Sequence, residues 1–287
     1  MTTQDYRTYY TVQHPENFDL DWKSFYQRCD ERTAAARKEL LHVLDLAYGP
    51  DPKQRLDIYQ PPGAPANAPV LLFLHGGGFL EGDRANYGFI APAYAKHGVI
   101  VVIASYRLVS GGFSLLAAVD DAKSMVKWVY RNIASHGGNP NSIVLSGHSA
   151  GAILSANLGV DLAWMQQDNI PSNALKAIVA VSGIYNFRAD DHSRDNILTS
   201  PEIKMAVSAM QHIKDLPPKM IIAVGSVETD PVTNYVASSE AFYAALQSSK
   251  KSTQQLLILP GENHQKTSLS LGDERSPLFQ ATLAACA

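Results

Sequence analysis

Long apolar runs and an excess of charge of one sign are both absent from this 287-residue sequence. No apolar run approaches the roughly 18 residues that a membrane-spanning helix needs, and the polar start MTTQDYRTYY lacks the apolar core of a signal peptide. The formal net charge is −3, so no basic surface favours nucleic acid or anionic lipid. We therefore expect a cytoplasmic protein that binds neither nucleic acid nor a membrane.

Cysteine is scarce, with Cys29 near one end of the sequence and Cys286 near the other. Two cysteines do not make a disulfide framework, and their low number is typical of a reduced compartment. The nine histidines show neither HExxH nor the Cys/His spacing of a metal site. The acids around His192, in RADDHSRD over 188–195, indicate a solvated loop. The sequence therefore predicts no metal site.

Short apolar runs alternate with helical patterns along the chain. The predicted strands are 43–48, 56–60, 70–75, 99–105, 142–146, 176–181, 219–224 and 255–259. From residue 70 onward the runs are continuously apolar, as expected for strands that are covered on both faces. Helical patterns are clearest at 115–135, 149–161 and 233–249. The alternation predicts one α/β domain over 1–287, with a mostly parallel sheet of about eight strands and helices on both faces.

The first part of the chain has a different pattern. The strands at 43–48 and 56–60 alternate more and have a short, turn-rich link, which predicts an antiparallel edge of the sheet. Residues 1–42 are predicted to form an N-terminal helical extension, with its helix at 19–42. The Pro/Ala stretch 61–69 joins two strands of one sheet, so we interpret it as an exposed turn.

A Gly-x-Ser-x-Gly motif at 147–151 stands between the strand at 142–146 and the helical pattern that follows. A strand that turns sharply into a helix brings the residues two before and two after the turn together, so both must be small. The residue at the apex, Ser149, is then strained, with its side chain exposed over the edge of the sheet. A serine between glycines can also be a simple helix N-cap. The placement after a buried strand favours a nucleophile.

Three glycines follow the strand at 70–75, in HGGGF over 75–79. Consecutive glycines leave backbone N–H groups unshielded, which suits a loop that points amides at a developing oxyanion. A phosphate-binding loop would need Gly-Lys-Ser/Thr or GxGxxG, and neither occurs here. Together with the serine motif downstream, the glycine loop predicts an oxyanion hole.

A histidine and two acids follow the later strands. His264 comes shortly after the strand at 255–259, and the chain order Ser, acid, His is the order expected of this architecture. Glu228 and Asp230 both follow the strand at 219–224, and either could accept the imidazole N–H. Phe79 and Tyr185 also follow strand ends, so we expect them to bind substrate, whereas Trp164 fits helix packing equally well.

HGGGF, GHSAG, the loop acid and the final Asn-His resemble α/β-hydrolases of the hormone-sensitive-lipase type. The stretches LAYGPDPKQRLDIYQP, WVYRNIASHGGNPNSIVLSGHSAG, VSGIYN and VGSVETD are more similar to the arylformamidase (kynurenine-formamidase-like) esterases of that superfamily. The likeness covers about 20–285 and implies the α/β-hydrolase fold. In that subfamily the acid follows a strand-end glycine by three positions; the glycine here is Gly225, which implies Glu228. The resemblance also implies oxyanion amides from Gly77, Gly78 and Ala150.

These observations predict a carboxylesterase for small or aryl esters, which forms an acyl-enzyme on Ser149 and needs no cofactor. The alternative is an arylformamidase-type amidase that acts on N-formylkynurenine or a similar amide with the same residues. A third hypothesis is a ligand-binding protein on the same fold. The complete set of serine, histidine, acid and glycine loop argues against this hypothesis. The sequence leaves a homodimer open.

Overall fold

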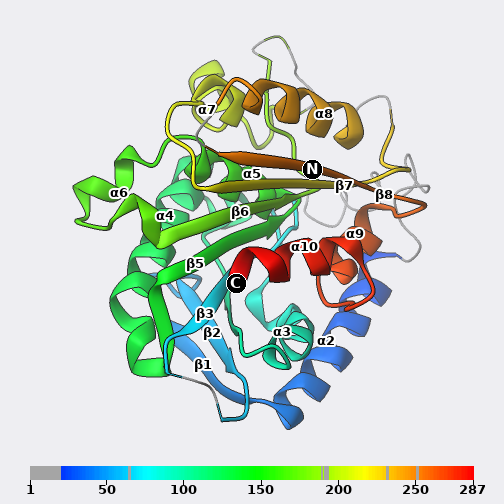
Figure 1. The fold of residues 1–287 in the computed structure, drawn as a ribbon. Helices are drawn as coiled ribbons and strands as arrows, with labels where there is room; N and C mark the ends of the chain where they lie inside the picture. The colour runs from blue at the N-terminus through cyan, green and yellow to red at the C-terminus, as the bar shows by residue number, and fades with distance from the viewer. Residues whose placement is uncertain (1–20, 64–65, 189, 191–193, 231–232, 250–251) are drawn as a thin grey trace.

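The computed structural model describes residues 21–63, 66–188, 190, 194–230, 233–249 and 252–287 (Figure 1). One eight-stranded sheet has the order β1-β2-β4-β3-β5-β6-β7-β8. β1 pairs antiparallel with β2 and β2 with β4, while all later pairs are parallel. The strands are β1 Leu41–Ala47, β2 Arg55–Gln60, β3 Ala68–Leu74, β4 Ile100–Ala104, β5 Gly138–His148, β6 Leu175–Val181, β7 Lys219–Gly225 and β8 Thr253–Leu259.

Helices cover both faces of the sheet. The α-helices are α2 Trp22–Glu39, α3 Ala91–Ala95, α4 Leu115–Asn132, α5 Ala150–Gly159, α6 Ala163–Gln167, α7 Pro201–Ala206, α8 Tyr235–Leu246, α9 His264–Ser270 and α10 Pro277–Cys286. Short 3-10 turns lie at Arg84–Asn86, Gly88–Ile90, Val109–Gly111, Ile133–His136, Ser172–Ala174 and Ala209–Gln211.

The core has two layers because successive side chains of a strand point to opposite faces of the sheet. In β3, Leu72 packs in the layer formed with α4, α5 and α8. Its neighbours Leu71 and Phe73 pack in the layer formed with α2, α3 and α10. Both layers are apolar, which explains why the parallel strands read as continuous apolar runs in the sequence.

The predicted architecture, a mostly parallel eight-stranded sheet with helices on both faces, is confirmed. All eight predicted strands are present, and the first two do form an antiparallel edge. The predicted N-terminal helix is α2, although residues 1–20 of the predicted extension lie outside the described residues. The predicted turn over 61–69 is shorter than expected because β3 begins at Ala68, and residues 64–65 also lie outside the described residues.

Side-chain hydrogen bonds fix the start of α2 and connect the segment after β3 to β1 and β2. The Asp21 side chain caps α2 by accepting from the Ser24 N–H at 3.0 Å. Arg84, after β3, donates to Asp57 on β2 at 2.9 Å and to Asp45 on β1 at 2.6 Å.

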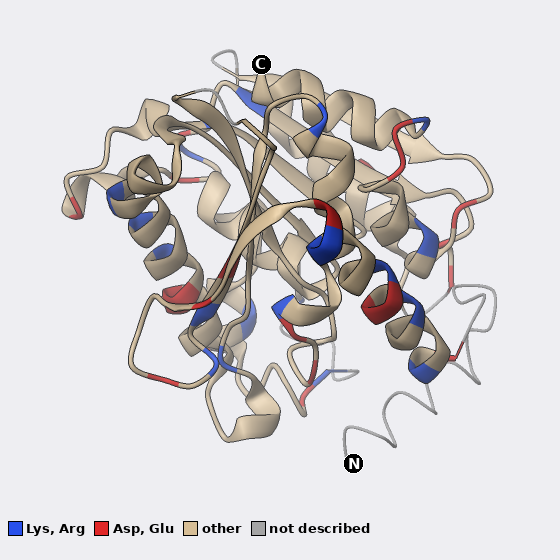
Figure 2. Ribbon diagram, turned by 90° about the horizontal axis from the view of Figure 1, so that it is seen from below, with Lys and Arg blue, Asp and Glu red and all other residues tan. Residues whose placement is uncertain are grey.

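In Figure 2, charged residues of both signs are spread over the outer helices and loops, and the strands are largely uncharged. Among the described residues, every helix is too short or too polar to cross a bilayer.

Candidate active site

Ser149 occupies a strained turn between β5 and α5. Its φ of 54° and ψ of −115° lie outside the usual regions for a residue with a side chain. The Ser149 N–H donates to the Val181 carbonyl of β6 at 2.8 Å, which fixes the turn to the neighbouring strand. A Cβ on Gly147 would lie 2.1 Å from the Gly151 oxygen, and a Cβ on Gly151 would lie 2.1 Å from the Leu74 oxygen. Both positions therefore require glycine, as the motif predicted.

A hydrogen-bonded relay leads from Ser149 through His264 to Glu228. The Ser149 hydroxyl donates to Nε2 of His264, with an Oγ–Nε2 distance of 2.9 Å. Nδ1 of His264 donates to Oε1 of Glu228 at 2.5 Å. Because Nδ1 carries the proton that the carboxylate accepts, Nε2 is the nitrogen that can take a proton from the serine. His264 and Glu228 are both buried.

The Glu228 carboxylate is held on both of its oxygens. Its Oε2 atom accepts from the Ser182 hydroxyl at 2.7 Å and from the Gly225 N–H at 2.7 Å. Ser182, at the end of β6, also lies 2.9 Å from the Thr267 hydroxyl of α9. The acid is therefore oriented by β6, β7 and α9 together.

Asp230, the other candidate acid, is buried in the same loop. Its Oδ1 atom accepts from the Thr233 N–H at 2.6 Å, shortly before α8 begins. Glu228 is the acid that the structure places at hydrogen-bond distance from His264.

His264 is positioned by contacts on three sides. It is the first residue of α9, where the Asn263 side chain caps the helix by accepting from the Lys266 N–H at 3.0 Å. The Tyr235 ring stacks on the imidazole at a centroid distance of 4.5 Å. On another side, Nε2 of His148 donates to the His264 carbonyl at 2.9 Å. Burial lowers the pKa of His148 well below its ordinary value, so its imidazole is neutral.

The glycine loop lies beside Ser149. Gly77, Gly78 and Phe79 have φ values of 119°, 61° and 61°, a run of left-handed backbone that the glycines make possible. The loop is fixed from behind by His75, whose Nδ1 donates to the Gly76 carbonyl at 2.6 Å and whose ring stacks on Tyr106 at 4.4 Å. Burial lowers the pKa of His75 to about 4.

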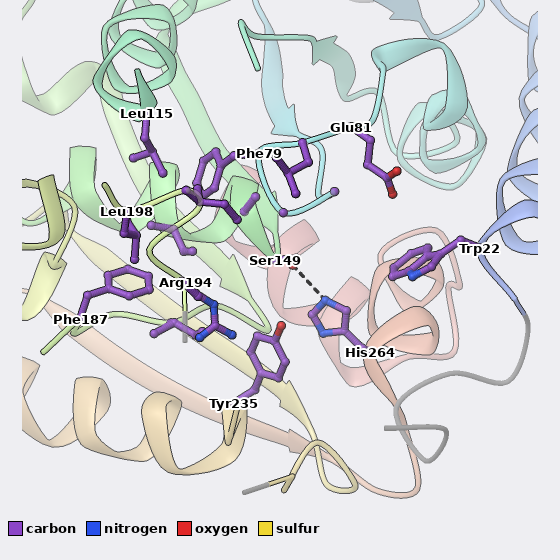
Figure 3. Close-up of a pocket in the computed structure, with 17 residues that line it drawn as sticks. Trp22, Phe79, Glu81, Leu115, Ser149, Phe187, Arg194, Leu198, Tyr235 and His264 are labelled. Atoms are coloured by element: carbon purple, nitrogen blue, oxygen red, sulfur yellow. Dashed lines mark hydrogen bonds between the residues drawn. The ribbon is translucent and has the colours of Figure 1, made fainter. Parts of the chain in front are cut away.

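A pocket opens above Ser149 and His264 (Figure 3). The predicted oxyanion residues Gly77, Gly78 and Ala150 line it, and so does Phe79. The other lining residues are mainly apolar and come from several elements: Trp22, Leu80, Glu81, Leu115, Ile153, Ile184, Phe187, Arg194, Ile197, Leu198 and Tyr235.

The position of Tyr185 contradicts the prediction from the sequence that this residue binds substrate. Its side chain is fully buried and stacks on Phe242 of α8 at a centroid distance of 4.4 Å. The Tyr185 oxygen accepts from the Gly183 N–H at 3.2 Å. The chain turns into the core after β6, so a position at a strand end did not bring Tyr185 into the pocket. Trp164 belongs to α6, where its Nε1 donates to the Leu158 carbonyl at 3.0 Å, which is a packing role.

None of the eleven other lining residues was predicted from the sequence to belong to the pocket. Trp22 was assigned only to a helical extension, Tyr235 to a helix, and Arg194 to a solvated loop. Arg188 and Asp190 of that loop are exposed and paired with each other, as a solvated loop predicts, but Arg194 lines the pocket. His192 lies outside the described residues. A tryptophan at the start of an amphipathic helix gives no signal that distinguishes packing from ligand contact.

Comparison with known proteins agrees with this architecture. A putative thioesterase from Silicibacter has the same fold, with a TM-score of 0.75, 20% identity and coverage of 94% of this chain and 95% of that one. Esterase 2 of Thermogutta terrifontis, in its apo form, gives a TM-score of 0.66 at 25% identity, over 84% of this chain and 90% of that one.

For the curated relatives, the match covers a smaller share of the relative than of this chain. Esterase LipC of Mycobacterium tuberculosis is 28% identical over 275 residues, 87% of this chain and 66% of the relative. A probable isoprenylcysteine alpha-carbonyl methylesterase of Arabidopsis thaliana is 28% identical over 79% of this chain and 58% of its own. The chain thus spans about three fifths of the length of these relatives. Kynurenine formamidase of Danio rerio is 27% identical over 75% of this chain and 72% of its own.

The model of one protein family, BD-FAE, matches residues 56–246. This range includes the glycine loop, the serine turn and Glu228. Because the match extends over more than half of the 287 residues and the fold agrees, the chain belongs to the BD-FAE family of α/β-hydrolases.

Proposed function

We propose that this protein is a carboxylic ester hydrolase with Ser149 as nucleophile, His264 as general base and Glu228 as the acid that orients the base. The observation that carries the proposal is the relay of two hydrogen bonds from Ser149 through His264 to Glu228, set beneath an apolar pocket. A serine hydroxyl is a weak nucleophile unless an adjacent base takes its proton, and this relay supplies such a base.

The reaction has two stages. As Ser149 Oγ attacks the ester carbonyl carbon, its proton passes to Nε2 of His264, and the carbonyl oxygen becomes an oxyanion held by the amides of Gly77, Gly78 and Ala150. The carbon–oxygen bond to the alcohol part then breaks, and His264 gives its proton to the departing oxygen. Water attacks the acyl-enzyme while His264 takes a proton from it, and the acid leaves as the proton returns to Ser149.

The pocket and the relatives support one substrate class. The lining is mainly apolar, which suits a short acyl chain or an aromatic ring. Solved structures of the Thermogutta esterase hold propionate and butyrate, at 26% and 25% identity to this chain. We infer small-acyl or aryl esters as substrates. The similarity to kynurenine formamidase of Danio rerio makes a formamide such as N-formylkynurenine the second candidate.

Replacement of the nucleophile tests the proposal. Ser149→Ala should lower kcat/KM about 10³-fold or more on every ester that the wild type cleaves, because the acyl-enzyme cannot form. Nitrophenyl esters of increasing acyl length and N-formylkynurenine serve as the substrate panel, with circular dichroism as the check on folding. Ser155→Ala is the matched control, since Ser155 is buried on α5 and donates to the Ala152 carbonyl, away from the relay. Near-normal turnover by folded Ser149→Ala would contradict the proposal.

A further inference from the structure

A permanent positive charge lines an otherwise largely apolar pocket. Arg194 shares the pocket with Ser149 and His264, and its neighbours there include Phe187, Ile197 and Leu198. A guanidinium stays protonated at every pH at which a protein is folded. A charge that borders a binding pocket discriminates among substrates, because it attracts an anionic group and disfavours a cationic one.

The Arg194 side chain is anchored rather than extended into solvent. Its Nη2 donates to the Thr233 hydroxyl at 2.7 Å, and Thr233 is itself buried in the loop between β7 and α8. The Arg194 carbonyl accepts from the N–H groups of Ile197 and Leu198 at 2.9 and 2.8 Å. These backbone hydrogen bonds hold the arginine next to the two apolar pocket residues. A guanidinium carries five donors in a planar fork, so an arginine held through Nη2 can also receive a carboxylate.

The charges of the pocket are separated in space. Figure 3 shows Arg194 between Phe187 and Leu198 on one side and Tyr235 on the other, while Glu81 lies across the pocket near Trp22. An acidic group is therefore attracted at the Arg194 end and repelled at the Glu81 end. This asymmetry fixes which way round an acidic substrate enters.

We propose that Arg194 determines specificity for esters whose acyl or alcohol part carries a carboxylate on an otherwise apolar body. The inference rests on the proposed function and goes beyond it by naming the charge of the substrate. The apolar body packs on the pocket walls, the ester carbonyl lies at Ser149, and the carboxylate pairs with the Arg194 guanidinium. Charge-assisted hydrogen bonds of this kind are about twice as strong as neutral ones, and their loss lowers kcat/KM selectively.

Two pairs of esters that differ in one carboxylate test the inference. The first pair, 4-acetoxybenzoate and its methyl ester, carries the charge on the alcohol part. The second, monomethyl and dimethyl adipate, carries it on the acyl part. For each pair the measured quantity is the ratio of kcat/KM for the acid over kcat/KM for its neutral partner, in wild type, Arg194→Met, Arg194→Lys and Arg188→Met. Arg188 is the matched control, because it is an exposed arginine paired with Asp190.

In at least one pair, Arg194→Met should lower the acid-to-neutral ratio about tenfold or more relative to wild type. Arg194→Lys should lower it by about threefold, because lysine keeps the charge and loses the fork. Arg188→Met should leave the ratio at its wild-type value. Arg194→Lys carries the same test if Arg194→Met does not fold.

Equal ratios in wild type and both Arg194 variants would overturn the inference and leave the proposed function standing. The same fall in Arg188→Met would also overturn it, by assigning the effect to general surface charge. Wild-type protein that cleaves none of the four esters in a Ser149-dependent way would overturn the proposed function and the inference with it.

Discussion

Two carboxylates that lie two positions apart, Glu228 and Asp230, have different partners. Glu228 accepts from His264, Ser182 and the Gly225 N–H, whereas Asp230 accepts from the Thr233 N–H. A buried acid that orients an imidazole contributes to catalysis through the tautomer that it holds, and a buried acid that accepts from a backbone N–H contributes to stability.

Replacement of each acid by its amide separates these roles. Glu228→Gln should reduce kcat about 10²–10⁴-fold on an activated ester, because the amide can hold His264 in the wrong tautomer. Asp230→Asn should reduce kcat less than about tenfold, because asparagine keeps an oxygen that can accept from Thr233. A severe loss in Asp230→Asn beside a mild loss in Glu228→Gln would transfer the orienting role to Asp230. Both variants are first shown by circular dichroism to be folded.

Side chains differ in how far the sequence reveals their place. Ser149 and His264 were located by motif and chain order, because a strained turn and the end of the last strand leave few alternatives. Tyr185 and Arg194 were misplaced because a loop leaves many alternatives for the direction of a side chain. Whether a loop side chain turns into the core, as Tyr185 does against Phe242, or toward a pocket, as Arg194 does, depends on tertiary contacts that no local pattern records.

Strands and long helices were predicted better than short ones. The parallel strands were found because buried parallel strands are apolar throughout, and β1 and β2 were found from their alternating pattern. Errors were confined to the ends of the strands. β5, for example, begins at Gly138 rather than 142, since Gly138 is paired with Ala68 at the start of β3. α6 and α7 have five and six residues, too few for a helical period to be visible.

The turn between β5 and α5 depends on a close approach of α5 to β3. Gly151→Ala would place a Cβ 2.1 Å from the Leu74 oxygen, so backbone atoms must shift. We expect the free energy of unfolding to fall by at least about 2 kcal/mol, as for other overpacked sites. Urea denaturation followed by circular dichroism measures the change.

Gly111→Ala is the control for this substitution. Gly111 is exposed, and a Cβ there would lie 3.4 Å from the nearest atom, in the Phe113 ring. Its free energy of unfolding should change by less than about 0.5 kcal/mol. Similar stability of the Gly151→Ala and Gly111→Ala variants would show that α5 can move away from the sheet without cost.

At the scale of the whole molecule, the burial of His75 and His148 makes stability depend on pH. Burial lowers the pKa of His75 to about 4 and that of His148 well below its ordinary value. An unfolded chain would bind protons on both below about pH 6.5, while the folded chain would not. Because the unfolded state then binds more protons, stability falls as the pH drops from about 6.5 toward 4.

This dependence can be measured on one variant. His75→Asn keeps a donor for the Gly76 carbonyl and removes the ionisable ring. Between pH 6 and 5 the free energy of unfolding of this variant should fall less steeply than that of the wild type, by up to about 1.4 kcal/mol per pH unit. Urea denaturation at a series of pH values gives both slopes. Equal slopes would mean that His75 takes up protons to the same extent in the folded and the unfolded protein.

The order of the site residues along the chain has a consequence for synthesis on the ribosome. Ser149 follows β5, Glu228 follows β7 and His264 follows β8. His264 follows Ser149 by 115 residues and Glu228 by 36. At translation speeds of about 5–20 residues per second, the base emerges roughly 6–23 seconds after the serine. During that interval the residues of the serine turn and the glycine loop have been synthesised, whereas the imidazole that accepts from the Ser149 hydroxyl has not. The proposed hydrolytic activity therefore requires that β8 has paired with β7 and that α9 has formed.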